Sequence, residues 1–521
     1  MARSAPVSMG CLARRGLLGS PLVCAWGKAT VLEKTLDWLN AIIWSPALIY
    51  LCLALGLYFS IRTRFMQVRG IPEMLHLMIN NQSSKSGVSS FQALSMSLAG
   101  RVGTGNIAGV ATAIAFGGPG AVFWMWVMAF LGASTSYVEC TLAQIYKERD
   151  DNGQYRGGPA YYIEKALGVK WYAWLFAVVT VIACGFLLPI VQINTLSESM
   201  VNAFSVPPLV LAAVITVGLA LIIYGGVKRI AAFAEFVVPF MAVAYIIVAV
   251  ILMALNADQL PAMFKMVIGS AFGVDAGFGA MLGLAVEWGV KRGVYSNEAG
   301  QGTGPHSAAA AEVAHPAQQG YVQAFAVYVD TLLVCSATAF MILSTGMYNI
   351  PDPAGGGGFL YQALPGAVAG PDFPQAAVDS ALPGWGAGFV AVAVLFFVFT
   401  TLVTYYYMAE TNVAYINRKV HRPWLIQLLR IAILAAVVWG VLRTTQTAWA
   451  LGDVGVGLMA WLNLIAIILL QKPALACLRD YERQRKTGGA LRFDPEALGI
   501  RNAEFWLKRQ REEDAGTGAG G

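Results

Sequence analysis

Long apolar runs alternate with short polar stretches along the whole chain. Runs of about 20 residues, the length that an α-helix needs to cross the hydrocarbon core of a membrane, recur throughout the sequence. They cover residues 41–61, 90–116, 119–146, 171–200, 207–226, 229–255, 275–297, 318–346, 385–416, 423–443 and 447–470. This pattern predicts an all-α polytopic membrane protein with about 11 transmembrane helices.

The second run contains a polar interruption. Residues 95–118 are apolar enough to cross a membrane, yet Gly103, Thr104, Gly105 and Asn106 lie in their middle. In hydrocarbon an unpaired backbone group costs several kcal/mol, so irregular backbone persists only where protein buries it or where it lines a polar cavity. Free amides at the start of a half-helix attract a carboxylate, and unwound carbonyls suit a sodium ion. The interruption therefore predicts a binding site within the membrane.

This stretch has two competing interpretations. The same residues fit G-x-G-x-x-A, the fingerprint of dinucleotide-binding folds, but no strand precedes the glycines and no acidic residue follows about 20 residues later. Gly105 and Gly109 also have the GxxxG spacing that lets two membrane helices pack closely. Packing is compatible with binding, but it does not require the polar Thr104 and Asn106.

A second interruption is expected in the seventh run, within residues 287–293 (EWGVKRG) and the following 296–302 (SNEAGQG). Without the first run, the others form two groups of five, and an odd number gives the groups opposite topology. Paired Gly-interrupted segments in inverted halves point to the binding site of a secondary transporter. The predicted units are an N-terminal segment (1–40), an extra N-terminal transmembrane helix (41–61), two inverted repeats (90–255 and 275–470) and a cytoplasmic tail (471–521).

Basic residues cluster in alternate loops. With the predicted spans, all of these clusters fall on one side: 62–85, 147–165, 228–229, 418–422 and 472–486. The opposite loop 347–384 contains three aspartates and no Lys or Arg. By the positive-inside rule the C-terminus is cytoplasmic and the N-terminus is outside, as in a protein of the plasma membrane or bacterial inner membrane. Basic residues within 1–40 conflict with this orientation, and a signal-like segment or a later start at Met9 would each account for them.

Composition agrees with a membrane protein. The 521 residues are 57% hydrophobic and 12% charged, with a mean hydropathy of +0.61, which argues against a soluble enzyme. The net charge of +6 comes from loop clusters and does not indicate nucleic-acid binding. Walker A, HExxH and GxSxG motifs are absent, so neither ATP-driven transport nor hydrolysis is supported. The cysteines and histidines lack metal-ligand spacing, and no metal beyond sodium is expected.

Further polar side chains lie inside other runs. Gln192 and Asn194 interrupt the fourth run, where hydrogen bonds between helices are the alternative to ligand binding. Thr400, Thr401 and Thr404 recur at helical spacing in the ninth run. Their hydroxyls can face a cation as neutral ligands, or bond to their own helix.

Charged residues within membrane helices cost about 2.5 kcal/mol or more each and often mark functional sites. They are Arg101, Glu139, Glu235, Glu287, Asp330 and Glu410. Asp330 lies deepest and is a candidate for binding a coupling ion or a proton. Arg101 lies just inside the first interruption and is a candidate for an inner gate with Glu139 or Glu410, between which the sequence does not choose. A static ion pair is the alternative for each.

Five sequence segments carry a further indication. They are GRVGTGNIAGVA (100–111), GGPAYYIEKALG (157–168), QINT (192–195), RGVYSNEAGQGTGPHSAAAA (292–311) and YVDT (328–331). Together they resemble the alanine or glycine:cation symporters of the amino acid–polyamine–cation superfamily, over most of residues 90–470. The resemblance implies the leucine-transporter fold, a 5+5 inverted repeat with two discontinuous helices, here preceded by one extra helix.

The resemblance also implies where the substrate binds. Thr104, Gly105 and Asn106 would lie near its carboxylate, while Gln192, Trp288 and Thr401 would close the pocket. A bulky Trp288 against the Gly-rich interruption would leave room for a methyl side chain and little more.

For the coupling ion, the resemblance implies a sodium site between the first and eighth core helices. It maps to carbonyls around Gly103 and to the hydroxyls of Thr400 and Thr401. Thr404 is an alternative ion ligand, because the alignment of this helix with the family leaves open which threonines face the ion.

The resulting hypothesis is a symporter, not an enzyme, that imports alanine or glycine with sodium by alternating access around a midplane site. Its partners would be a small amino acid and membrane lipids, without nucleic acid or ATP. A larger amino acid such as glutamine, or proton coupling through Asp330, is the nearest alternative. A channel or an amino-acid sensor would also place polar backbone at membrane depth, but inverted halves favour alternating access.

Overall fold

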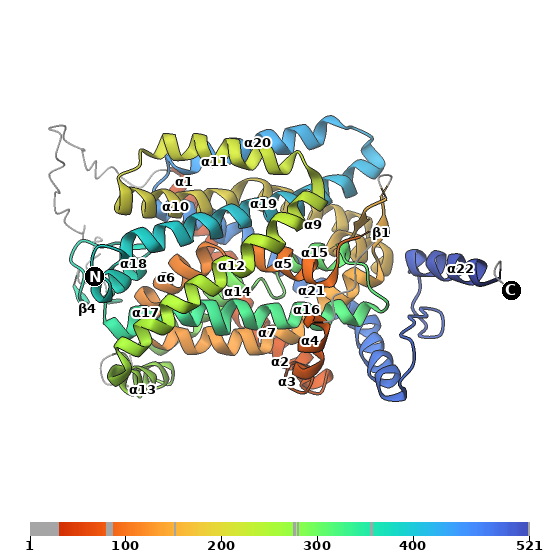
Figure 1. Cartoon of the computed structure of the whole chain (residues 1–521), viewed down its shortest axis with the longest axis horizontal. Coiled ribbons are helices and arrows are strands. Elements are labelled where there is room, and N and C mark those ends of the chain that lie inside the picture. The colour runs from red at the N-terminus through yellow and green to blue at the C-terminus, as the bar shows by residue number, and fades with distance from the viewer. Residues whose placement is uncertain are drawn as a thin grey trace, which may run out of the picture.

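The structure is a computed structural model that describes residues 31–79, 87–150, 153–274, 278, 281–354 and 358–518. Helices make up most of these residues and lie side by side in one bundle, with a short β-hairpin at each end (Figure 1). The prediction of an all-α protein is therefore confirmed.

The elements follow in chain order. The α-helices are α1 (Val31–Ile43), α2 (Pro46–Arg62), α3 (Met66–Arg69), α4 (Ile71–Ile79), α5 (Ser90–Arg101), α6 (Val110–Gly117), α7 (Gly120–Ile145), α8 (Pro159–Tyr162), α9 (Lys170–Ile182), α10 (Leu188–Phe204), α11 (Pro208–Ile223), α12 (Gly226–Leu255), α13 (Leu260–Ala271), α14 (Leu282–Asn297), α15 (Gly304–Ala310), α16 (Pro316–Tyr328), α17 (Ser336–Thr345), α18 (Asp372–Ala381), α19 (Gly386–Val420), α20 (Trp424–Gly440), α21 (Thr445–Thr487) and α22 (Glu504–Gly518). Wider π-helical turns are η1 (Gly105–Gly109), η2 (Ile163–Leu167), η3 (Ala183–Leu187) and η6 (Val329–Cys335), and η4 (Ala257–Gln259) is a 3₁₀ turn. Strand β1 (Glu148–Arg149) pairs with β2 (Tyr155–Arg156), and β3 (Asn349–Pro351) pairs with β4 (Phe359–Gln362), both antiparallel.

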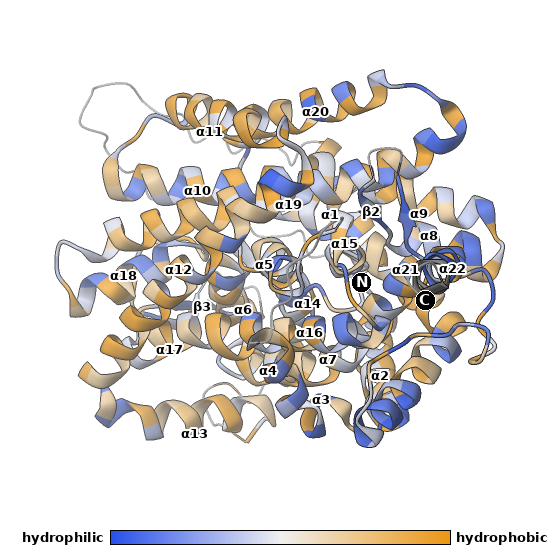
Figure 2. Cartoon of the chain, turned by 45° about the vertical axis from the view of Figure 1, so that its right-hand side comes forward, coloured by the Kyte–Doolittle hydropathy of each residue, from blue (hydrophilic) through white to orange (hydrophobic). Residues whose placement is uncertain are grey.

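Seven stretches of described helix are long and apolar enough to cross a membrane by length and composition: Val31–Arg62, Gly120–Ile145, Lys170–Phe204, Gly226–Leu255, Pro316–Thr345, Gly386–Val420 and Thr445–Thr487. Gly105–Gly117, Pro208–Ile223 and Trp424–Gly440 are shorter apolar helices. Hydrophobic residues run along most of these helices (Figure 2). The helices support a polytopic membrane protein, while the predicted number of spans stays a prediction.

The first span begins earlier than the predicted residue 41. Helices α1 and α2 form one stretch, Val31–Arg62, that bends at Ser45, just before Pro46 starts α2. The Asn40 side-chain amide donates to the Ala450 carbonyl (3.0 Å), and the Trp44 indole donates to the Asp453 carbonyl (2.9 Å). These bonds tie the extra N-terminal helix to α21.

Two helices in the centre of the bundle are interrupted. Helix α5 ends at Arg101, and the chain resumes as η1 and α6 after residues 102–104. Helix α14 ends at Asn297, and the chain resumes as α15 after residues 298–303. Since α5 packs against α15 and α6 packs against α14, the two interrupted helices run antiparallel. This arrangement is the one expected of the first helices of two inverted repeats.

The prediction that the second interruption begins within residues 287–293 is wrong. Helix α14 is continuous there. Its basic residues Lys291 and Arg292 pair with Asp453 on α21, so the polar stretch stays helical. The backbone leaves the helix at Glu298, and Gly300 and Gly302 adopt positive φ values of 82° and 87°, which side chains with a Cβ rarely tolerate.

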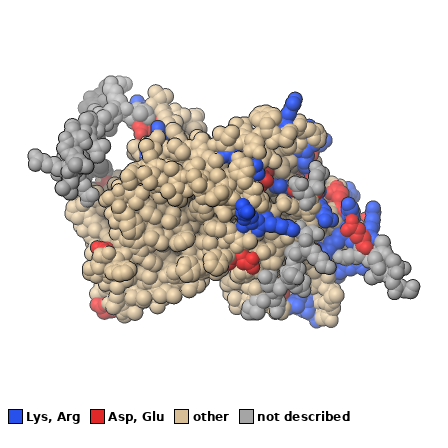
Figure 3. All heavy atoms as spheres, turned by 45° about the horizontal axis from the view of Figure 1, so that its top comes forward, with Lys and Arg blue, Asp and Glu red and all other residues tan. Residues whose placement is uncertain are grey.

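Lysine and arginine gather at one end of the bundle (Figure 3). We call it the basic end; it carries β1, β2, α22 and the last turns of α19 and α21. Helix α13, helix α18 and the β3–β4 hairpin lie at the opposite end (Figure 1). Helix α21 continues to Thr487, so the predicted tail, which begins at residue 471, starts inside a helix.

Helix α14 packs closely against α7 at Gly289. A Cβ atom there would lie 2.5 Å from the Trp124 Cβ and 2.6 Å from the Ala121 carbonyl oxygen. We expect Gly289→Ala to destabilise the protein by about 1–3 kcal/mol, because these atoms belong to backbone or to the root of a side chain and cannot rotate away. The loss is measured as a lower Tm of the purified protein in detergent.

Gly283→Ala is the matched control on the same helix, since no atom lies within 4 Å of its Cβ position. An equal fall in Tm for both variants would contradict close packing at Gly289.

Candidate functional site

The first interruption is held by side chains that satisfy its backbone amides. The Gly103 N–H donates to the Asn106 Oδ1 (2.9 Å). The Thr104 N–H donates to the Oε1 of Gln192 on α10 (3.1 Å). All four residues are buried. The structure thus brings the predicted Thr104, Asn106 and Gln192 together, and gives the two amides partners within the protein.

Asn106 also joins the interruption to Asp330 in η6. Its side-chain N–H donates to the Asp330 Oδ1 (2.7 Å), and the hydroxyls of Ser296 and Thr331 both donate to the Asp330 Oδ2 (2.8 Å each). Asp330 is fully buried. Its carboxylate therefore has three donors, from η1, α14 and η6, and connects the first interrupted helix to the second.

Five oxygen atoms converge between α5 and α19. The Thr401 hydroxyl lies 2.9 Å from the Ala99 carbonyl oxygen, 3.4 Å from that of Val102 and 2.8 Å from that of Phe397. The Thr400 hydroxyl lies 2.9 Å from the same Phe397 oxygen. We call this group the oxygen cluster: the carbonyls of Ala99, Val102 and Phe397 and the hydroxyls of Thr400 and Thr401.

Two residues predicted for the ion site lie outside the oxygen cluster. The Gly103 carbonyl accepts from the Asn106 backbone N–H (3.2 Å). The Thr404 hydroxyl donates to the Thr400 carbonyl in its own helix (3.0 Å), and its methyl group faces Gly100. The structure thus favours Thr400 and Thr401 over Thr404, and Ala99 and Val102 over Gly103.

The second interruption is held by Glu139 of α7. Its carboxylate accepts from the backbone N–H groups of Gly300 (3.1 Å) and Gly302 (3.2 Å) and from the Asn463 side chain (2.6 Å). Asn463 also donates to the Gly300 carbonyl (2.9 Å) and contacts the Tyr162 hydroxyl. Glu139 therefore holds the loop of the second interruption, and its role in a gate with Arg101 stays a prediction.

Arg101 is buried and points away from both predicted partners. Its guanidinium donates to the Gln323 carbonyl (3.1 Å) and to the Ser136 hydroxyl (3.2 Å). Among the described residues it forms no ion pair within 4 Å, although Glu139, Glu298 and Asp330 all lie within its electrostatic reach.

Glu410 pairs instead with Arg156, at 3.7 Å, and Arg156 also binds Asp150 at 2.6 Å. In the described part of the chain no ion pair joins Arg101 to Glu410, and a gate formed by these two residues stays a prediction. Glu410 belongs to the basic end, where the β1–β2 hairpin meets α19.

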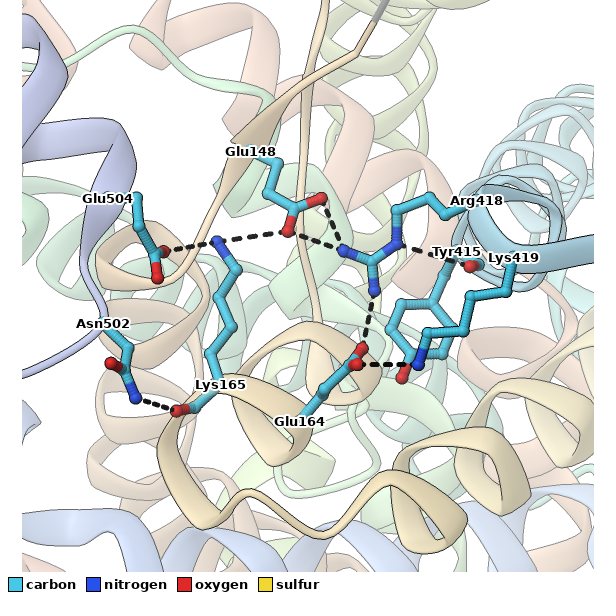
Figure 4. A network of polar contacts seen from close by, with 8 residues as sticks. All are labelled: Glu148, Glu164, Lys165, Tyr415, Arg418, Lys419, Asn502 and Glu504. Atoms are coloured by element: carbon cyan, nitrogen blue, oxygen red, sulfur yellow. Dashed lines mark hydrogen bonds and ion pairs between the residues drawn. The ribbon is translucent and has the colours of Figure 1, made fainter.

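A network of ion pairs extends from this point (Figure 4). Arg418 at the end of α19 binds Glu148 (2.6 Å) and Glu164 (2.7 Å). Lys165 binds Glu148 (3.2 Å) and Glu504 of α22 (3.0 Å). The network thus links β1, η2, α19 and the C-terminal helix α22.

Glu164 stays ionised within this network. Burial alone would raise the pKa of Glu164, but the Tyr415 hydroxyl, Lys419 and Arg418 together hold that pKa below its usual range.

Trp288 lies at the opposite end and not beside Gly105. Its ring lies 4.8 Å from that of Phe116, and the Arg292 guanidinium lies 5.0 Å above it. Trp288 lies nine positions before Asn297 in the chain, which corresponds to about 13 Å along the helix. Trp288 is therefore part of the cluster around the pairs of Asp453 with Lys291 (2.8 Å) and Arg292 (2.8 Å).

Tyr295 and Ser296 occupy the place expected of Trp288. A Cβ on Gly105 would lie 3.1 Å from the Tyr295 ring and 3.2 Å from the Ser296 Cα. The hydroxyls of Thr104 and Tyr295 are buried and interact with each other, and neither makes a hydrogen bond of standard geometry to a described residue. Sequence reasoning missed both residues because it placed the interruption too early; the polar Ser296-Asn297-Glu298 run was the available signal.

Comparison with known proteins shows which family the chain resembles. Residues 29–495 match the family described as the sodium:alanine symporter family. YrbD of Bacillus subtilis is 59% identical over 475 residues, covering 91% of this chain and 98% of YrbD. The sodium/proton-dependent alanine carrier protein of Bacillus sp. strain PS3 is 50% identical over 435 residues, covering 83% of this chain and 97% of the carrier.

A solved structure supports the fold. The protein MhsT, crystallised in complex with L-phenylalanine, superimposes with a TM-score of 0.53 at 13% identity, over 76% of this chain and 96% of MhsT. That likeness establishes the fold alone, which is the predicted leucine-transporter fold. With the match over most of its length, the chain belongs to the sodium:alanine symporter family and is an integral membrane transporter, not an enzyme.

Proposed function

We propose that this protein imports alanine, or an amino acid of similar size such as glycine, together with sodium. The basic end would face the cytoplasm, as the positive-inside rule requires, in a plasma membrane that would be a bacterial inner membrane. The observation that carries the proposal is the meeting of the oxygen cluster and the first interruption at the same end of α5.

The oxygen cluster suits a sodium ion. Hard cations take carbonyl and hydroxyl oxygens as ligands, and the cluster offers three carbonyls and two hydroxyls from two helices. Bound sodium would replace the hydrogen bonds that Thr401 now makes to Ala99 and Val102. It would thereby hold the end of α5 against α19.

The substrate would bind beside this ion, between the two interruptions. Gln192 now provides the acceptor for the Thr104 N–H, and a substrate carboxylate supplies an acceptor of the same kind. Thr104, Gly105 and Asn106 would then surround the carboxylate, with Gln192 and Thr401 nearby. Tyr295 and Ser296 press closely on Gly105 and would limit the side chain to a small one.

Two sets of ion pairs would close the site at its ends. Lys291 and Arg292 with Asp453 would close the outer side, where Trp288 also packs. Arg156 with Glu410, and Arg418 with Glu148, would close the cytoplasmic side. Arg101 and Asp330 would position the interruptions, with proton binding at Asp330 as the alternative role.

Uptake into proteoliposomes tests the proposal. We expect an inward sodium gradient to drive labelled alanine above its equilibrium level. An inward proton gradient alone should not do so, because the neutral oxygens of the cluster suit a metal cation and do not bind a proton. Both gradients are varied independently, with alanine, glycine and glutamine as substrates.

Several outcomes would contradict the proposal. Uptake driven only by protons would assign the coupling ion to another site such as Asp330. Flux that never exceeds equilibrium would indicate a channel, and binding without flux a sensor. Preferential accumulation of glutamine would refute the proposed size limit.

Thr401 tests the sodium site. We expect Thr401→Val, which keeps the shape but removes the hydroxyl oxygen, to weaken sodium activation of alanine uptake by about 10-fold or more, since it removes one ligand and leaves the Ala99 and Val102 carbonyls unpaired. Thr401→Ser is the matched control, because it keeps the hydroxyl. The sodium concentration for half-maximal uptake is the measurement, and equal values for the two variants would remove Thr401 from the ion site.

A further inference from the structure

Glu298 has a buried carboxylate group. It is the first residue of the second interruption, with a left-handed backbone (φ 58°), and its side chain is fully buried. Neither carboxylate oxygen makes a hydrogen bond of standard geometry with a described residue; the neighbouring Thr303 hydroxyl interacts with the carboxylate and is itself without a hydrogen bond of standard geometry. Removing a carboxylate from water without partners costs several kcal/mol, so a ligand that donates hydrogen bonds would stabilise its ionised form.

Other deeply buried carboxylates nearby are satisfied. Glu139 accepts from two backbone amides and Asn463. Asp330 accepts from Asn106, Ser296 and Thr331. Asp453 pairs with Lys291 and Arg292. Glu298 therefore differs from carboxylates that stabilise the fold.

Arg101 is the cation that acts on Glu298, and two of its three nitrogens are engaged elsewhere, while its Nε is buried without a hydrogen-bond partner among the described residues. Its Nη1 and Nη2 donate to the Gln323 carbonyl and to the Ser136 hydroxyl, as described above. Arg101 thus contributes positive potential around Glu298 without donating a hydrogen bond to it. The two oxygens of the Glu298 carboxylate can therefore accept hydrogen bonds from a ligand.

Glu298 faces the first interruption. Its Oε2 lies 3.5 Å from the position that a Cβ on Gly100 in the last turn of α5 would take, next to the Met408 and Thr404 side chains. Its electrostatic neighbours include Tyr405 on α19 and Cys184 in η3. Tyr405 also interacts with Gln192, the residue that holds the Thr104 N–H. Glu298 thus acts electrostatically on Tyr405, which interacts with the residue that lies at the proposed carboxylate position.

We propose that Glu298 binds the α-ammonium group of the transported amino acid. This inference rests on the proposed function. An ammonium group offers three N–H donors and a positive charge, which are what the Glu298 carboxylate lacks. With the carboxylate of the substrate at Thr104 and Gly105, the two interruptions would recognise the two charges of a zwitterion. The site would then reject hydroxy acids and simple monocarboxylates of the same size.

The test compares alanine with lactate, in which a hydroxyl replaces the ammonium, and with propionate, which has neither. Binding to purified protein is measured by thermal-shift titration in saturating sodium. We expect wild-type protein to bind alanine far better than lactate or propionate. In Glu298→Gln, the alanine Kd should rise by about 10- to 100-fold, the range for a lost hydrogen bond to a charged group. The lactate Kd should stay unchanged or fall, so the preference for alanine over lactate collapses.

Two further variants and one further measurement control the experiment. Glu287→Gln makes the same charge change on the exposed face of α14 and should leave alanine binding unchanged. Glu298→Asp keeps the charge and should retain more affinity for alanine than Glu298→Gln. Sodium binding without alanine should be the same in Glu298→Gln as in wild type, which also shows that the variant is folded.

Three results would overturn the inference: an alanine Kd within about twofold of wild type in Glu298→Gln, an unchanged preference for alanine over lactate, or a loss of sodium binding with alanine affinity retained. The last would assign Glu298 to the coupling ion. If wild-type protein itself showed no sodium-dependent alanine binding, the proposed function would fail instead.

Discussion

Backbone groups that leave a helix inside the membrane must find partners within the protein, and this requirement shapes the centre of the molecule. At the first interruption Asn106 and Gln192 accept from the Gly103 and Thr104 amides. At the second, Glu139 accepts from two glycine amides. Two of these partners come from α7 and α10, outside the interrupted helices. The shape of each interruption therefore depends on how the surrounding helices pack.

The end of α5 offers two kinds of group within a few residues. Its last carbonyls, at Ala99 and Val102, face Thr401, while the next amide, at Thr104, faces Gln192. A helix end thus presents acceptors for a cation and a donor for an anion side by side. An ion that fixes the carbonyls also fixes the amide, which is a direct physical route for coupling. By linkage, each ligand would raise the affinity for the other.

The sequence was sufficient to predict the fold class and the first interruption, because Gly-rich polar residues in the middle of an apolar run are costly in a membrane unless they serve a site. The family resemblance pointed to Asn106 and Gln192, and the structure brings both to this interruption. It misplaced the second interruption. Lys291 and Arg292 suggest a broken membrane helix until Asp453, far away in the chain, pairs with both. The partners of Arg101, Glu139 and Glu410 also depend on contacts between distant helices. The Ala99 and Val102 carbonyls that we propose as sodium ligands have no side-chain signature, so only the backbone geometry points to them.

The buried charges near the interruptions connect substrate binding to the closing of the two ends of the bundle. Three carboxylates, Glu139, Asp330 and Glu298, surround the cation Arg101 near the interruptions, and the first two have donors of their own. Without ligand, the Glu298 carboxylate must take up water or a proton, and water at this depth requires an open path from one end of the bundle. With the proposed ammonium contact in place, the carboxylate is satisfied in a dry site, and closing both ends costs less. The same unpartnered group that would select an amino acid would therefore also favour the closed state only when the substrate is present.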